Sequence, residues 1–132
     1  MARPPIDESP APSGQLVLQT LSMPADTNPY GDIFGGWLMT QMDLGGAILA
    51  QEIAQGRVTT VAVSSMSFLR PVPVGATVSC YATPLEVGRT SIRTLIEVWI
   101  KGPSRSKFAK VTEGEFVYVA IDDNGRTRPV PK

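Results

Sequence analysis

The longest stretch of apolar and small residues in the chain lies between residues 35 and 55. On a helical wheel, at about 100° per residue, its polar side chains gather on one side. These side chains belong to Thr40, Gln41, Gln51, Glu52 and Gln55. The pattern predicts one largely buried helix about 30 Å long, and Gly56 directly after it is typical of a helix C-terminus.

Apolar residues elsewhere alternate or cluster as they do in β-strands. One such stretch precedes the helix, at residues 15–22, and four follow it, at residues 58–69, 76–82, 91–101 and 107–121. Gly114 is expected to mark a bulge in the last strand. The alternation predicts that two sets of side chains face the core, namely Ala76, Val78, Cys80 and Ala82 and then Ile92, Ile96, Val98 and Ile100.

The order of these elements predicts an α+β domain at residues 15–123. Short connections between the last four strands imply antiparallel pairing, and the sheet is expected to curl around the single helix. One helix covers only one face, and long edge strands need protection, so we expect two copies to pair edge to edge. Residues 1–14 are predicted to be a disordered tail and residues 124–132 a Pro-rich basic tail.

Composition excludes several functional classes. With 12 acidic and 12 basic residues, net charge suggests neither nucleic-acid binding nor attachment to a membrane surface. The N-terminus lacks the apolar segment of a signal peptide, and no apolar run reaches roughly 18 residues. The only cysteine, Cys80, allows no internal disulfide and fits a cytoplasmic location.

The chain contains no histidine. This excludes Ser-His-Asp and Cys-His nucleophilic machinery, histidine general bases and histidine-ligated zinc, and no metal site is expected. An enzyme of this composition has to rely on carboxylates, backbone N–H groups and neutral polar side chains.

Asp43 is the exception on the apolar side of the predicted helix. It shares a stripe with Gly36, Met39, Ala47, Ala50 and Ala54. A carboxylate among such residues must be paired, hydrogen-bonded or functional, because burying an unpaired charge is costly. A satisfied structural acid stays the alternative. Asp32, by contrast, is expected to be an N-cap or first-turn acid of the helix.

The segment from Asn28 to Asp43 reads NPYGDIFGGWLMTQMD, which resembles the signature of hotdog-fold acyl-CoA thioesterases, in particular the small bacterial YciA-like branch. The resemblance covers roughly residues 22–122. Further matching segments are residues 45–47, 50–54, 57, 60–63, 68–75, 88–91 and 97–99.

The resemblance implies a hotdog fold, in which a curved antiparallel sheet of about five to six strands wraps one long helix. It implies hydrolysis of acyl-CoA to a free acid and CoA, with no cofactor, since CoA is part of the substrate and product. It also implies a homodimer-built assembly, commonly a hexamer formed as a trimer of dimers.

The resemblance also assigns roles to residues of the signature. Asp43 maps onto the catalytic carboxylate, which either activates water or attacks the thioester directly. The N–H of Gly35 or Gly36 maps onto the donor to the carbonyl oxygen, at the positive end of the helix dipole. Asn28 maps onto an asparagine that orients the carbonyl or the water. The alternatives are that Asn28 only shapes a turn and that the two glycines only permit packing, as expected for Gly45 and Gly46.

The phosphates of CoA call for cations or free N–H groups. The resemblance places pantetheine along Gly88, Arg89, Thr90 and Ser91, and Arg70 lies at a strand end. A basic hairpin supplies the remaining candidates, Lys101, Arg105, Lys107 and Lys110. Ordinary solvated surface charge is the alternative for each of them.

Gly35 and Asp43 are eight residues apart, hence separated by about 12 Å along one helix. An aspartate side chain spans only a few ångströms, so both groups reach one thioester only if they come from two chains. We therefore predict active sites shared across a homodimer. Two other functions fit the fold class. A hotdog dehydratase is disfavoured because such enzymes commonly use histidine, and a non-catalytic acyl-CoA sensor gains nothing from Asp43.

Overall fold

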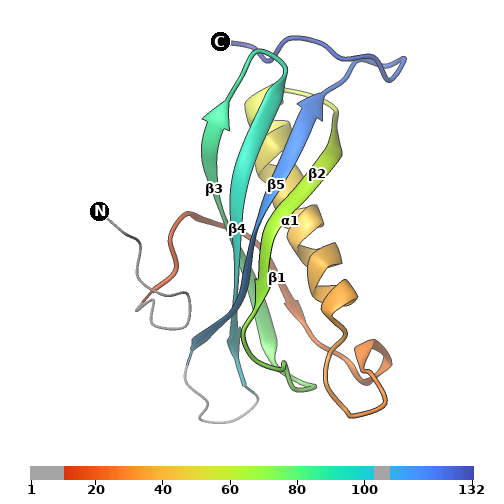
Figure 1. The fold of residues 1–132 in the computed structure, drawn as a ribbon, viewed down its shortest axis with the longest axis vertical. Helices are drawn as coiled ribbons and strands as arrows, with labels where there is room; N and C mark the ends of the chain where they lie inside the picture. Colours follow the sequence, from red (N-terminus) through yellow and green to blue (C-terminus); the bar gives the residue numbers. More distant parts are fainter. Residues whose placement is uncertain (1–10, 103–107) are drawn as a thin grey trace.

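The computed structural model describes residues 11–102 and 108–132. One α-helix packs along one face of a curved antiparallel sheet (Figure 1). A short 3₁₀ turn, η2, covers Pro24–Asp26. The other elements, in chain order, are β1 (Gln15–Leu21), α1 (Gly35–Ala54), β2 (Val58–Phe68), β3 (Thr77–Val87), β4 (Ser91–Lys101) and β5 (Ala109–Ala120).

The described residues form a sheet of five strands in the order β1-β3-β4-β5-β2, and every pairing is antiparallel. This confirms the predicted α+β hotdog architecture and places β2 at one edge. β3 is longer than predicted and runs through Pro84 to Val87. A register shift between Pro84 and Glu86 accommodates the proline, which has no N–H to donate, so the strand continues beyond it.

The predicted core faces of β3 and β4 are confirmed. All eight side chains named from the alternation are buried, none being more than 8% exposed. They meet the buried face of α1, which is formed by Leu38, Met42, Gly45, Gly46, Leu49, Ala50 and Ala54. A sheet and a helix that each bury one apolar face against the other form a single core.

The bulge expected at Gly114 lies on the neighbouring strand instead. Gly114 pairs regularly with Ile96 of β4. The irregularity opposite Gly114 is in β2, between Ser64 and Ser67, where Ser65 has a φ of 53°. A Cβ at Gly114 would lie 2.7 Å from Cε of Met66, so this glycine makes room for a side chain of the bulged strand.

The exposed side of α1 is less polar than the wheel suggested. Thr40, Gln51, Glu52 and Gln55 are exposed as expected. Leu44 and Ile48 of the same helix are also 52% and 40% exposed. Edge strand β2 exposes Val61 and Val63 as well. An apolar helix side together with an exposed edge strand supports pairing with a second copy.

Residues beyond β5 pack back onto the domain. Ile121 bridges to Thr127, and the Val130 N–H donates to the carbonyl oxygen of Arg89 at 2.7 Å. At the other terminus, the predicted disordered tail covers residues 1–14, of which residues 1–10 lie outside the described residues. Residues 11–14 are described, and Ser13 hydrogen-bonds Glu97 of β4. No helix among the described residues is long and apolar enough to span a bilayer.

Candidate active site

Asp43 lies near the middle of α1 and is held by side chains from two strands. Its Oδ1 accepts a hydrogen bond from Thr60 Oγ1 of β2 at 2.6 Å. The Tyr118 hydroxyl of β5 lies 3.1 Å from the same Oδ1 and 2.9 Å from the Asp43 backbone oxygen. No described residue donates a hydrogen bond to Oδ2. The carboxylate is therefore satisfied at one oxygen and available at the other.

A cavity of about 270 Å³ opens beside this carboxylate. Its walls come from α1, β2 and β5 and are mostly apolar. They are formed by Met39, Thr40, Asp43, Leu44, Val63 and Phe116. Met42, in contrast, is fully buried in the core. Of the two methionines of the signature, only Met39 can contact a ligand here.

The start of α1 leaves backbone donors unused. Phe34 is the N-cap residue, no side chain caps the helix, and the first turn contains no acidic residue. The N–H groups of Trp37 and Leu38 donate to the Phe34 carbonyl oxygen. Among the described residues, no acceptor is found for the N–H of Gly35 or Gly36. An uncapped helix N-terminus of this kind can bind a partly negative oxygen.

The expectation that Asp32 caps the helix is wrong. The helix begins three residues later, at Gly35, and Asp32 forms an isolated bridge with Pro73 instead. The bridge between Thr27 and Ile33 also holds this part of the loop in an extended path. Asp32 is therefore too far from the first turn to cap it.

Four glycines of α1 fall into two groups. A Cβ at Gly46 would lie 2.3 Å from the Tyr118 hydroxyl, and one at Gly45 would lie 2.9 Å from Val17. These two glycines permit packing, as expected. A Cβ at Gly36 would meet no atom of the described residues within 4 Å, and one at Gly35 would make only ordinary contact with Phe68. Packing within the chain therefore does not explain Gly36.

Asn28 shapes the loop before the helix through one end of its side chain. Its Oδ1 accepts hydrogen bonds from the N–H groups of Tyr30 and Asp32, at 2.9 and 3.1 Å. These contacts fix the carboxamide with its NH₂ group pointing away from the loop donors. No acceptor for that NH₂ is found in the described part of the chain. The turn-shaping role and a donor role are thus compatible.

A second cavity, of about 380 Å³, lies at the start of α1. It brings together three of the residues singled out from the sequence, Asn28, Gly35 and Arg70. Its other lining residues are Asp32, Ile33, Leu38, Phe68, Leu69, Pro71 and Val72. Asp43 does not line this cavity, in keeping with the axial separation of about 12 Å along α1.

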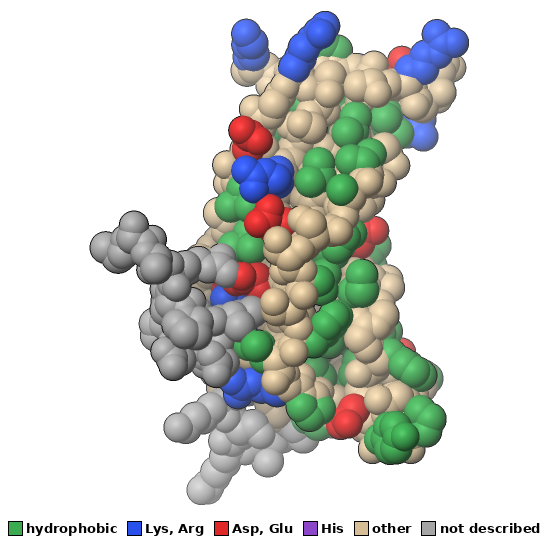
Figure 2. Space-filling model, viewed as in Figure 1, with side chains coloured by type: hydrophobic (Ala, Val, Ile, Leu, Met, Phe, Trp, Pro, Cys, Tyr) green, Lys and Arg blue, Asp and Glu red, His purple; other side chains and the backbone are tan. Residues whose placement is uncertain are grey.

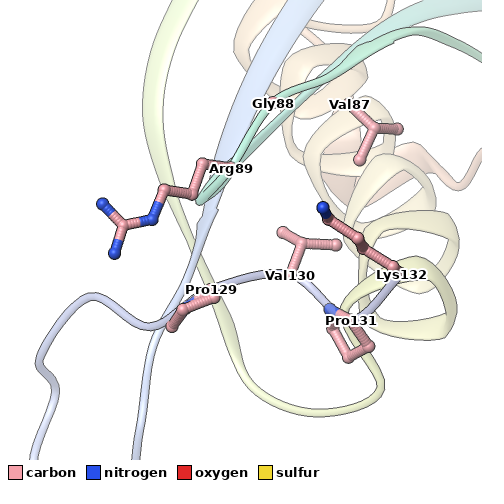
Figure 3. Close-up of a pocket in the computed structure, with 7 residues that line it drawn as sticks. All are labelled: Val87, Gly88, Arg89, Pro129, Val130, Pro131 and Lys132. Carbon is pink, nitrogen blue, oxygen red and sulfur yellow. The ribbon is translucent and has the colours of Figure 1, made fainter.

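Gly88 and Arg89 lie at the opposite end of the molecule, at the β3–β4 turn. They line a cavity of about 630 Å³ together with Val87 and the C-terminal residues Pro129, Val130, Pro131 and Lys132 (Figure 3). Lys and Arg side chains are also visible at this end in the space-filling view (Figure 2). This cavity is larger than the other two described here, but no Asp or Glu is among its lining residues, so we place the chemistry at Asp43. Thr90 and Ser91 follow directly at the start of β4, and the Thr90 carbonyl oxygen accepts the N–H of Ala120.

The basic hairpin is only partly described. Lys101 is exposed at the end of β4, whereas Arg105 and Lys107 lie outside the described residues. Lys110 is 4% exposed and forms ion pairs with Glu97 at 3.4 Å and Glu113 at 2.7 Å. Its role as a phosphate-binding candidate is therefore wrong, because the side chain is buried and its ammonium group is paired with two carboxylates.

Neither Thr60 nor Tyr118 was given a role from the sequence, although Thr60 begins one of the segments that match the family. They lie 17 and 75 residues from Asp43 in the chain, and both fall in ordinary strand patterns. Burial, then the charge of Asp43 and their hydrogen bond, raise the pKa of Tyr118 well above its usual range. The phenol is therefore a neutral donor. Elsewhere in the described chain, no cluster of three potential metal ligands occurs.

Comparison with known proteins places these observations in a family. Residues 30–107 match the family model of the thioesterase superfamily. The acyl-CoA thioester hydrolase YciA of Salmonella typhimurium is 59% identical over 123 residues, which cover 91% of this chain and 92% of that protein.

Two crystal structures resemble the fold closely. The hexameric thioesterase y2039 from Yersinia pestis superposes with a TM-score of 0.88 at 58% identity, covering 92% of this chain and 99% of that one. An aspartate-to-alanine mutant of a hexameric broad-specificity acyl-coenzyme A thioesterase superposes with a TM-score of 0.88 at 54% identity, covering 91% and 88%.

Proposed function

The chain belongs to the thioesterase superfamily and is an acyl-CoA thioester hydrolase, and we propose that Asp43 carries its reaction. The observation behind this proposal is the state of the Asp43 carboxylate. One oxygen is held by two hydroxyl donors, and the side chain borders a largely apolar cavity. A carboxylate fixed beside a space that suits an acyl chain is placed to act on a thioester carbonyl.

Two chemical routes start from this carboxylate. As a general base, Asp43 takes a proton from water while the water oxygen attacks the thioester carbon. As a nucleophile, it forms a mixed anhydride that water then hydrolyses. In both routes the C–S bond breaks, CoA leaves as its thiol, and the acyl group leaves as a free acid.

Donors at the helix start complete the proposal. The thioester oxygen gains negative charge as the carbonyl is attacked, so fixed donors aimed at it lower the barrier. The N–H groups of Gly35 and Gly36 are uncapped, and the Asn28 carboxamide is oriented by the loop. We propose that the N–H groups of Gly35 and Gly36 donate to the thioester oxygen. The Asn28 carboxamide then orients either the thioester oxygen or the attacking water.

These donors and Asp43 come from different chains in the proposed site. Within one helix they are about 12 Å apart, and they border two separate cavities. Pairing two helices antiparallel about a two-fold axis places the helix start of one chain beside Asp43 of the other. The exposed Leu44 and Ile48 on the helix, with the exposed edge β2, support such a contact.

The CoA portion needs cationic or N–H partners at the mouth of the site. We propose Arg70 at the cavity beside the helix start and Gly88 to Ser91 at the β3–β4 turn. The side chains of Arg70 and Arg89 are both exposed. Lys101 stays a candidate because its side chain is also exposed. Arg105 and Lys107 stay candidates from the sequence alone.

The assembly is expected to be a multimer built from these dimers. The two related thioesterases of known structure compared above are hexameric. We therefore propose a trimer of dimers, in which every dimer holds two equivalent sites.

The experiment that tests the function is Asp43→Asn. We expect turnover of acyl-CoA to fall about 100-fold or more, the scale of a lost general base, while the protein stays folded and still binds CoA. Glu52→Gln makes the same chemical change at an exposed site of the same helix and should leave turnover within about twofold. A folded Asp43→Asn protein with near-normal thiol release contradicts the proposal.

A further inference from the structure

Tyr118 places a phenol hydroxyl between two oxygens of one residue. Its Oη is 2.9 Å from the Asp43 backbone oxygen and 3.1 Å from Asp43 Oδ1. A phenol has one hydrogen to donate, so it is shared between these acceptors. The Tyr118 side chain is fully buried, and its ring stacks on that of Phe116 with centroids 6.5 Å apart. The hydroxyl is thus held in place by packing as well as by its acceptors.

The helix is built to admit this hydroxyl. Gly46 lies on the same side of α1 as Asp43, and a Cβ there would come within 2.3 Å of the hydroxyl oxygen and 3.0 Å of the ring carbon that bears it. Any other residue at this position would move the phenol. The approach of Tyr118 to Asp43 therefore depends on a buried glycine in the middle of the helix.

We propose that Tyr118 is a positioning residue which, together with Thr60, fixes Oδ1 of Asp43 and thereby makes Oδ2 the oxygen that reacts at the thioester. This inference rests on the proposed function of Asp43. Thr60 and Tyr118 both donate to Oδ1, and no described residue occupies Oδ2. Two donors on one oxygen stop the carboxylate from rotating, because exchanging its oxygens breaks both hydrogen bonds.

The charges near Asp43 make a pH readout possible. β1 and β2 carry no charged residue, and Tyr118 is the only titratable side chain that the described part of the sheet places in contact with Asp43. Of the charged side chains of β4 and β5, Arg93 pairs with Glu115 and Lys110 pairs with Glu97 and Glu113, while Lys101 is exposed at the end of β4. Glu86 of β3 lies near Arg93, and Glu52 on the helix is exposed.

The first test is Tyr118→Phe, which removes only the hydroxyl. A hydrogen bond to a charged group contributes enough that kcat should fall about 10-fold, with KM changed less than about twofold because substrate does not touch this residue. The acid limb of the pH profile of kcat/KM should move to higher pH, because the carboxylate loses a donor that stabilises its charged form.

A matched control and a second variant separate positioning from structure. Tyr81→Phe makes the same change on the opposite face of the sheet, where Tyr81 packs against Phe108, and should leave the profile unmoved. Replacing Tyr118 with 3-fluorotyrosine keeps the ring and the hydroxyl but makes the phenol a stronger donor. It should move the acid limb to lower pH, opposite to phenylalanine, even if Tyr118→Phe fails to fold.

The outcomes distinguish this inference from the proposed function. If Asp43→Asn is inactive but neither change at Tyr118 moves the acid limb, the positioning role is wrong and the function of Asp43 stands. If Asp43→Asn is active, the proposed function itself fails. In the Asp43→Asn background, Tyr118→Phe should have no further effect on residual turnover, and an undiminished effect there would assign Tyr118 to structure alone.

Discussion

Asp43 and Cys80 both have side chains that could take part in a reaction, but the fold places them in opposite environments. Asp43 is half-buried, held at one oxygen and next to a cavity. Cys80 is 1% exposed and faces the core of the sheet. A thiolate needs solvation or a nearby positive charge, and the core provides neither. Exposure therefore separates the residue that can react from the residue that only packs.

Cys80 should be unreactive in the folded protein. Burial raises the pKa of its thiol to about 12, so the reactive thiolate is scarce at pH 8, and reagents cannot reach the sulfur. We expect no reaction with a disulfide reagent such as DTNB at pH 8 over the time of an activity assay, and release of one equivalent in denaturant. Rapid labelling of the native protein contradicts this assignment.

At the scale of the element, α1 combines two surfaces with different uses of glycine. Gly45 and Gly46 face the sheet and admit Val17 and Tyr118. Gly36, at the first turn, has open space beside it as far as the described part of the chain goes. The same residue type thus serves close packing in the middle of the helix and an accessible backbone at its start.

Alanine substitutions should distinguish these two surfaces. Gly46→Ala overpacks the contact with Tyr118 and should lower the free energy of unfolding by about 1–3 kcal/mol, even though alanine favours helix. Gly36→Ala should leave that free energy unchanged or slightly higher, while lowering turnover if the N–H groups bind the thioester oxygen. Urea denaturation followed by circular dichroism measures both, and equal destabilisation would mean that the Gly36 surface is filled by packing in the assembly.

At the scale of the whole molecule, the candidate groups lie at separate places on one chain. Asp43 is at the middle of α1, Asn28 and Gly35 border the cavity at the start of α1, and Arg89 borders the cavity at the β3–β4 turn. This turn and the start of α1 lie at opposite ends of the molecule (Figure 1). A single acyl-CoA engages groups from all three places only if a second chain brings a helix start close to Asp43.

Complementation between inactive subunits tests the shared site. Asp43→Ala subunits are mixed with subunits blocked by Gly36→Leu, a side chain for which the single chain has space near Cβ. Under subunit exchange, each heterodimer regains one intact site, so an even random mixture should reach up to about a quarter of wild-type activity. If exchange is demonstrated by mixed labels and no activity returns, the shared-site proposal is wrong.

The amino-acid sequence by itself determined the elements and their faces. α1 was predicted at residues 35–55 and is observed at Gly35–Ala54, and β4 has the predicted bounds, Ser91–Lys101. These features follow from local periodicity, since a helix or strand buries every residue on one face. Asp43 stood out for the same reason, because a charge on an apolar stripe breaks the period.

Only the tertiary structure decided what surrounds Asp43 and which expected contacts fail. Tyr118 reaches Asp43 because β5 lies between β4 and β2 in the sheet, beneath the glycines of α1. Lys110 is not a phosphate ligand because β4 and β5 bring two carboxylates to its ammonium group. Asp32 does not cap α1 because β-bridges hold the loop before the helix in another path. Such contacts join residues far apart in the chain, and they depend on strand order and register, which local patterns do not encode.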